Sequence, residues 1–153
     1  MVKLIACAGL TIVTVLAGSS PKWKADLSPQ GGSKISGHAT VESRGTDSVA
    51  MTISIHGGEI NSSYAWHLHQ GACGANGQIQ GMETAYPELK TSESGSAETS
   101  VTLPIAPPTS GVYSVNVHPQ ASGYKDADSS KKLTAAVVAC GQLKPAGDQP
   151  DSQ

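Results

Sequence analysis

The fold is decided by two segments, KISGHATV at residues 34–41 and VAMTISIH at residues 49–56. Each alternates small or apolar residues with polar ones, so every second side chain falls on the same face of a strand. Residues 44–47 (RGTD) lie between them and include the Gly and Asp that turns favour. The pattern predicts an antiparallel hairpin that buries one face.

The same period of two returns in four later segments of the chain. Turn residues separate them, and no segment has the spacing of a convincing amphipathic helix. The 17 Gly and 9 Pro suit short strands and tight turns, and the absence of Phe leaves a core of Val, Ile, Leu and Ala. We therefore expect an all-β fold, an antiparallel Greek-key β-sandwich or barrel. The four later strands are expected at residues 64–69, 98–105, 111–118 and 133–143, with long loops at 71–96 and 119–132.

Length and charge exclude some classes of function. The 153 residues are enough for one domain with appendages. Ten Lys and Arg against 12 Asp and Glu give a net charge of −2, which excludes a strongly basic nucleic-acid binder. The sequence holds no phosphate-binding glycine loop, no nucleophile elbow and no Cys-x-x-Cys motif. The carboxylates are spread out, and no catalytic residue is assigned.

Residues 1–17 are predicted to be a signal peptide. Lys3 is followed by an apolar run, residues 4–17, that is too short to span a bilayer. A buried N-terminal helix is the alternative. Ser19 stands where a lipoprotein signal would carry its lipidated Cys, so we expect a free exported protein, in a bacterial periplasm or outside the cell. The predicted parts that follow are a flexible linker at 18–32, the β-domain at 33–143 and a disordered tail at 144–153.

Two cysteines, Cys73 and Cys140, remain once Cys7 leaves with the signal peptide. An even pair in an oxidising compartment favours a disulfide. The alternative is that one of the thiols binds a soft metal.

Three histidines are the candidate functional residues. His67 and His69 share the outward face of one predicted strand, and His118 ends another with the same orientation. If these strands are neighbours, three neutral imidazoles converge on one ion, for which Cu(II) has the highest affinity among divalent metals. Such a site leaves a coordination position open, as catalytic sites do. The plainer interpretation is histidines that face solvent. His56 is a possible fourth ligand or a surface residue, and His38 is a weaker candidate.

The motifs around these residues resemble a known family. WHLH at 66–69 with Gly71 and Cys73, VNVH at 115–118 and VACG at 138–141 are similar to the copper–zinc superoxide dismutase superfamily, closest to its exported bacterial members. They are also similar to the chordin-type (CHRD) domain. The dismutase resemblance implies an eight-stranded Greek-key barrel, copper on the three histidines and a disulfide between Cys73 and Cys140.

The chain departs from that family in two ways. No His lies between His69 and His118, so the bridging His and the zinc ligands are missing and no zinc is expected. Val137 stands where the family has its guiding Arg, and the only Arg in the chain is Arg44, on a predicted distant turn. Lys131 and Lys132 could supply positive charge instead, or could lie in a solvated loop.

These observations predict an exported copper-binding protein with weak or no superoxide dismutation, which serves copper buffering or delivery or oxidative defence. An active copper-only dismutase and a non-enzymatic interaction module of the CHRD type are the alternatives. Copper is the expected cofactor and superoxide a candidate substrate. No nucleic acid and no membrane span are expected, and pairing at a strand edge leaves a homodimer open.

Overall fold

The computed structural model describes residues 20–75, 77–119 and 137–147. These residues form nine β-strands and one short 3-10 helix, and none of them is in an α-helix. Every strand pair is antiparallel. The elements are β1 (Lys22–Pro29), β2 (Ser36–Ser43), β3 (Val49–His56), β4 (Ser63–Gln70), η1 (Glu83–Ala85), β5 (Leu89–Lys90), β6 (Ala97–Leu103), β7 (Tyr113–Pro119), β8 (Ala139–Gln142) and β9 (Lys144–Pro145).

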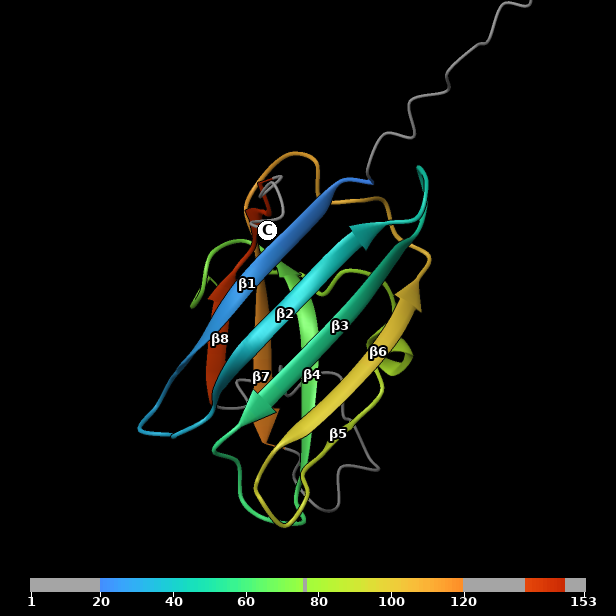
Figure 1. The fold of residues 1–153 in the computed structure, drawn as a ribbon. Coiled ribbons are helices and arrows are strands. Elements are labelled where there is room, and N and C mark those ends of the chain that lie inside the picture. The colour runs from blue at the N-terminus through green and yellow to red at the C-terminus, as the bar shows by residue number, and fades with distance from the viewer. Residues whose placement is uncertain (1–19, 76, 120–136, 148–153) are drawn as a thin grey trace, which may run out of the picture.

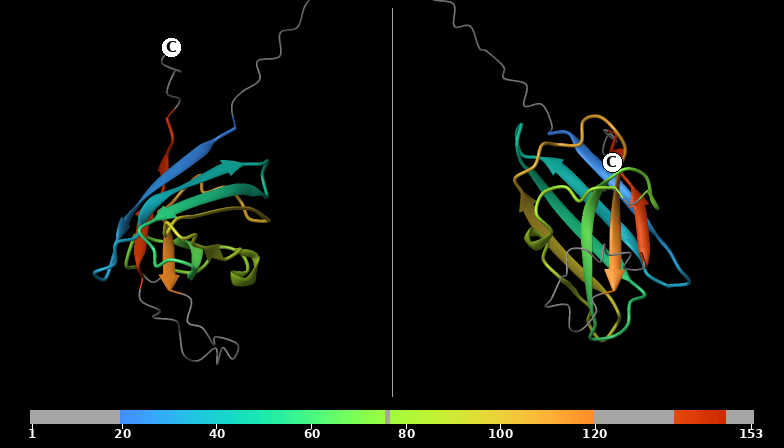
Figure 2. Two further views of the ribbon diagram at one scale, coloured as in Figure 1. Left: turned by 60° about the horizontal axis from the view of Figure 1, so that its bottom comes forward. Right: turned by 180° about the vertical axis from the view of Figure 1, so that it is seen from behind.

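The strands form a nearly closed barrel. Their order is β5-β4-β7-β8-β1-β2-β3-β6, and the two end strands, β5 and β6, lie in contact. One wall consists of β1, β2, β3 and β6, and the other of β4, β7 and β8 (Figures 1 and 2). The connections β3–β4 and β6–β7 each pass two strands of the barrel before the chain re-enters it. This confirms the predicted antiparallel Greek-key β-sandwich or barrel.

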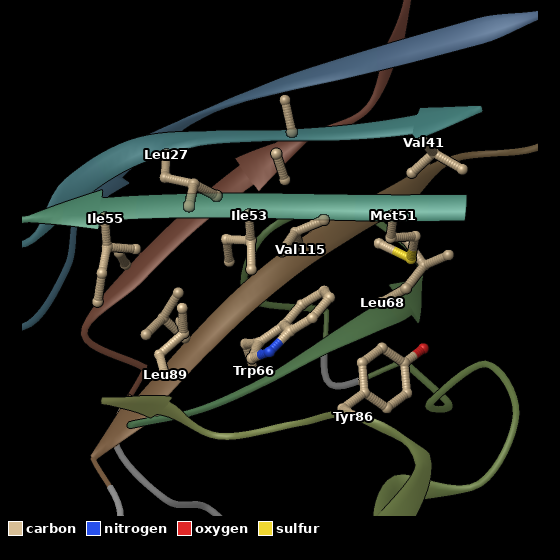
Figure 3. Close-up of a cluster of buried hydrophobic side chains, with 14 of the residues drawn as sticks. Leu27, Val41, Met51, Ile53, Ile55, Trp66, Leu68, Tyr86, Leu89 and Val115 are labelled. Atoms are coloured by element: carbon tan, nitrogen blue, oxygen red, sulfur yellow. The ribbon is translucent and has the colours of Figure 1, made fainter. Parts of the chain in front are cut away.

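The core lies between the two walls. The alternation predicted for β3 is confirmed, because Val49, Met51, Ile53 and Ile55 are all buried. Trp66 meets them from the opposite wall (Figure 3). Since the inward positions of β4 are filled by apolar residues, its other face is left for polar side chains.

The predicted flexible linker, residues 18–32, is wrong over most of its length. Residues 22–29 form β1, which lies between β8 and β2. Trp23, Ala25 and Leu27 alternate inward and are buried, while Lys22 and Lys24 point outward. The prolines and glycines that suggested a loose segment belong to the ends of this strand and the turn after it, so the domain begins before residue 33.

The predicted tail and loop also contain ordered pairing. Lys144 and Pro145 pair with β1, so the sheet extends into the predicted tail. The predicted loop at 71–96 contains η1 and β5, and Tyr86 and Leu89 within it are buried. The predicted signal peptide, residues 120–136 and residues 148–153 lie outside the described residues. No helix among the described residues has the length and apolar character needed to cross a membrane.

Candidate metal centre

Two neighbouring strands carry the three candidate histidines. In the pairing of β4 with β7, His67 lies opposite Asn116 and Ala65 lies opposite His118. Trp66 and Leu68 face the core from the positions on either side of His67. His67, His69 and His118 therefore share the outer face of the β4–β7 pair, as the period of two predicted.

The three imidazoles converge. One ring nitrogen from each of His67, His69 and His118 lies within 4.8 Å of the other two. The ring centroids of His67 and His69 are 5.9 Å apart, those of His67 and His118 5.7 Å, and those of His69 and His118 6.0 Å. This geometry allows all three side chains to bind a single ion.

The polar atoms without partners gather at the same place. Among the described residues, the buried side-chain nitrogens and oxygens that lack a hydrogen bond are His67 Nδ1, His69 Nε2 and Ser114 Oγ. Ser114 lies directly opposite His69 on β7. Leaving one such atom unpaired costs about 1–3 kcal/mol. Two unpaired nitrogens on the predicted ligands fit a site that takes up a metal ion.

A backbone carbonyl fixes the orientation of His69. Its Nδ1 lies 3.0 Å from the carbonyl oxygen of Gly77 and donates to it. The proton is then on Nδ1, and the lone pair of Nε2 is free for a ligand. Gly77 packs tightly against the carbonyl of Gln70, where a Cβ atom would overlap it, so only glycine fits.

His67 is held in its neutral form. Burial, followed by the neighbouring His118 and then His69, lowers its pKa from 6.5 to about 3. A neutral imidazole is the form that binds a metal, so this ligand does not have to lose a proton at neutral pH.

A disulfide joins β8 to the segment that follows His69. Cys73 and Cys140 are bonded, which confirms the predicted disulfide and leaves neither thiol free for a metal. Cys140 lies opposite Asn116, which in turn lies opposite His67, so the bond attaches the segment after His69 to the same row of the sheet. With a sequence separation of 67 between the cysteines, the chain-entropy model gives a stabilisation of about 4 kcal/mol.

The other sequence candidates do not join the three histidines. His56 is exposed at the end of β3, where its Nε2 lies 2.8 Å from Ser36 Oγ, and it is not part of the group. His38 is exposed on β2. Arg44 lies in the β2–β3 turn, 3.5 Å from Glu42. Lys131 and Lys132 lie outside the described residues.

Sequence reasoning missed three residues of this centre. Gly77, Tyr86 and Ser114 surround the histidines in the structure. Gly77 and Tyr86 belong to a predicted loop with little alternation, so no periodic pattern could have identified them. Ser114 could have been identified from the sequence, because alternation places it on the same outward face of its strand as His118.

The chain matches no protein-family model and no curated protein.

Proposed function

We propose that this is an exported copper-binding protein, a distant relative of the superoxide dismutase superfamily that lacks the zinc site. Its function would be copper buffering, copper delivery or oxidative defence, with weak or no superoxide dismutation. The observation that carries the proposal is the convergence of His67, His69 and His118, with two of their buried nitrogens unpaired.

The donor set favours copper over other metals. Three neutral imidazoles suit copper, zinc or nickel, and Cu(II) heads the affinity order of the divalent ions. Three protein ligands would leave one coordination position open. Copper, when bound, supplies one-electron redox chemistry. The protein contributes the fixed orientation of His69, the neutral state of His67 and a rigid pair of strands.

Slow dismutation is inferred from charge. A fast reaction with an anion depends on positive potential around the metal. The one arginine of the chain, Arg44, is paired with Glu42 in the β2–β3 turn, and the net charge is −2. Val137 stands at the position where the related dismutases have their guiding arginine. We therefore propose that superoxide is not drawn rapidly to this site.

Export is supported by two independent features. The first 17 residues have the sequence pattern of a secretory signal. The disulfide between Cys73 and Cys140 is of the kind that persists in oxidising compartments.

Copper retention tests the proposed function. The protein is loaded with Cu(II), dialysed against buffer, and examined by metal analysis and electron paramagnetic resonance. We expect wild type to keep a single equivalent with an axial spectrum. His118→Ala should lose it, because two imidazoles remain. His38→Ala is the matched control, since it removes an exposed histidine outside the group, and it should keep the copper.

Failure of wild type to retain copper would end the proposal. The same loaded sample measures the second part of it. We expect a steady-state superoxide dismutation rate no greater than that of an equal concentration of free Cu(II). A rate far above that value would instead identify an active copper-only dismutase.

A further inference from the structure

Tyr86 is wedged between the core and the metal centre. Its ring meets His67 edge to face, with centroids 5.2 Å apart and planes at 82°. It meets Trp66 in the same way, at 5.1 Å and 88°. Figure 3 shows Tyr86 beside Trp66 at the margin of the core. Tyr86 is buried, with 8% of its surface exposed. Through Trp66 and His67 it contacts side chains from both faces of β4.

Tyr86 belongs to a segment that covers the edge of β4, residues 77–88, called here the edge segment. Beyond the two-residue strand β5, this segment bonds to β4 directly. Gln70 N–H donates to the carbonyl of Gln78 at 2.9 Å, and Gln80 N–H donates to that of Leu68 at 2.8 Å. Near the other end, Trp66 Nε1–H donates to the carbonyl of Pro87 at 2.7 Å.

The hydroxyl of Tyr86 forms a hydrogen bond within the edge segment. It donates to the carbonyl oxygen of Gln80 at 2.7 Å. The edge segment is therefore held at Gln78, Gln80 and Pro87, with the Tyr86 ring directed at His67.

We propose that Tyr86 is a positioning residue for the metal centre. Its ring fixes the plane of His67, whose buried Nδ1 has no hydrogen-bond partner. Its hydroxyl fixes the edge segment, whose Gly77 carbonyl orients His69. One aromatic side chain thus sets the direction of two of the three ligands before any metal arrives. This inference rests on the proposed metal-binding function.

A matched pair of tyrosines separates positioning from general packing. Tyr64 is buried to a similar extent, 6%, and its hydroxyl accepts a bond from Glu59 N–H at 2.9 Å. It lies on the core side of β4, away from the histidine face. Tyr64→Leu therefore removes a comparable buried ring without touching the metal ligands.

The test measures Cu(II) affinity by competition with a chelator, together with the electron paramagnetic resonance spectrum. We expect Tyr86→Leu to weaken affinity by about 10- to 100-fold, the usual effect of losing a group that orients a ligand. Its copper hyperfine splitting should change, because the ring of His67 is no longer fixed. Tyr86→Phe keeps the ring against His67 and loses only the bond to Gln80, so it should recover part of the affinity and lie between wild type and Tyr86→Leu. Tyr64→Leu should keep the wild-type spectrum even where stability falls.

Tyr86→Met keeps the experiment decisive if the leucine variant does not fold, because methionine retains apolar volume without a rigid ring. It should show the same altered spectrum. Wild-type affinity and an unchanged spectrum in either variant would overturn the inference, as would an equal loss in Tyr64→Leu. If wild type itself bound no copper, the proposed function would fail first, and the two failures are thereby distinguished.

Discussion

Different neighbours surround the rings of His67 and His69. His69 has its Nδ1 proton directed to Gly77, whereas His67 is surrounded by the ring of Tyr86 and two other imidazoles. The sequence predicted that all three histidines face outward, because alternate residues of a strand share a face, and that they converge if their strands are neighbours. It could not indicate which nitrogen of each ring is free, because that depends on partners distant in the chain.

Acid should destabilise the metal-free protein through His67. The folded-state pKa is about 3 and the ordinary value is 6.5, so between these values the unfolded chain binds more protons. Stability is therefore lost as pH falls below 6.5, by about 2 kcal/mol between pH 7 and pH 5 from this group. Urea unfolding in the presence of a chelator measures the loss.

The variant His67→Gln serves as the control for this pH effect, because it keeps a neutral polar side chain and removes the titrating group. Its stability should fall less over the same pH interval. An identical pH dependence in the variant and in wild type would show that His67 is not the source.

The edge segment takes the place of a regular neighbouring strand along most of β4. Strand β5 pairs only with Ser63 and Tyr64, and the rest of that edge is covered by residues 77–88. The close approach of Gly77 to Gln70 brings the Gly77 carbonyl to His69. The geometry of the three histidines thus depends on an irregular segment as much as on β4 and β7.

Substitution Gly77→Ala should weaken copper binding. The added Cβ would overlap the Gln70 carbonyl, so the segment must move and the bond to His69 is lost. We expect a loss in Cu(II) affinity of about 10- to 100-fold, measured by chelator competition. Gly147→Ala is the control, since a Cβ there meets no atom within 4 Å. Equal affinities for the two variants would contradict this account.

Strand β1 joins the two walls of the barrel. It pairs with β2 along six residue positions and with β8 and β9 at its two ends. Trp23, Ala25 and Leu27 place its inner face in the core. A barrel without β1 would expose the edges of β2 and β8 and open its core to water.

Removal of residues 1–32 should therefore abolish folding, which circular dichroism would show as loss of the β-sheet spectrum.

Within the intact chain, Trp23→Ala should lower the free energy of unfolding by roughly 3 to 5 kcal/mol, because it leaves a large cavity. Val112→Ala, at a side chain with 45% of its surface exposed, should change it by less than about 0.5 kcal/mol. A truncated chain that still folds would mean that β1 is dispensable.

Alternation along the sequence was enough to predict the strand class, the inward faces of β2, β3, β4 and β7, and the outward orientation of the three histidines. Those features follow from local alternation, which depends only on the geometry of an extended backbone. Only the folded structure shows that residues 22–29 are a central strand and that β4 and β7 are neighbours. It also shows the hydrogen bond of Gly77 to His69 and the contact of Tyr86 with His67. These depend on contacts between residues far apart in the chain, and such contacts leave no periodic signal in a single sequence.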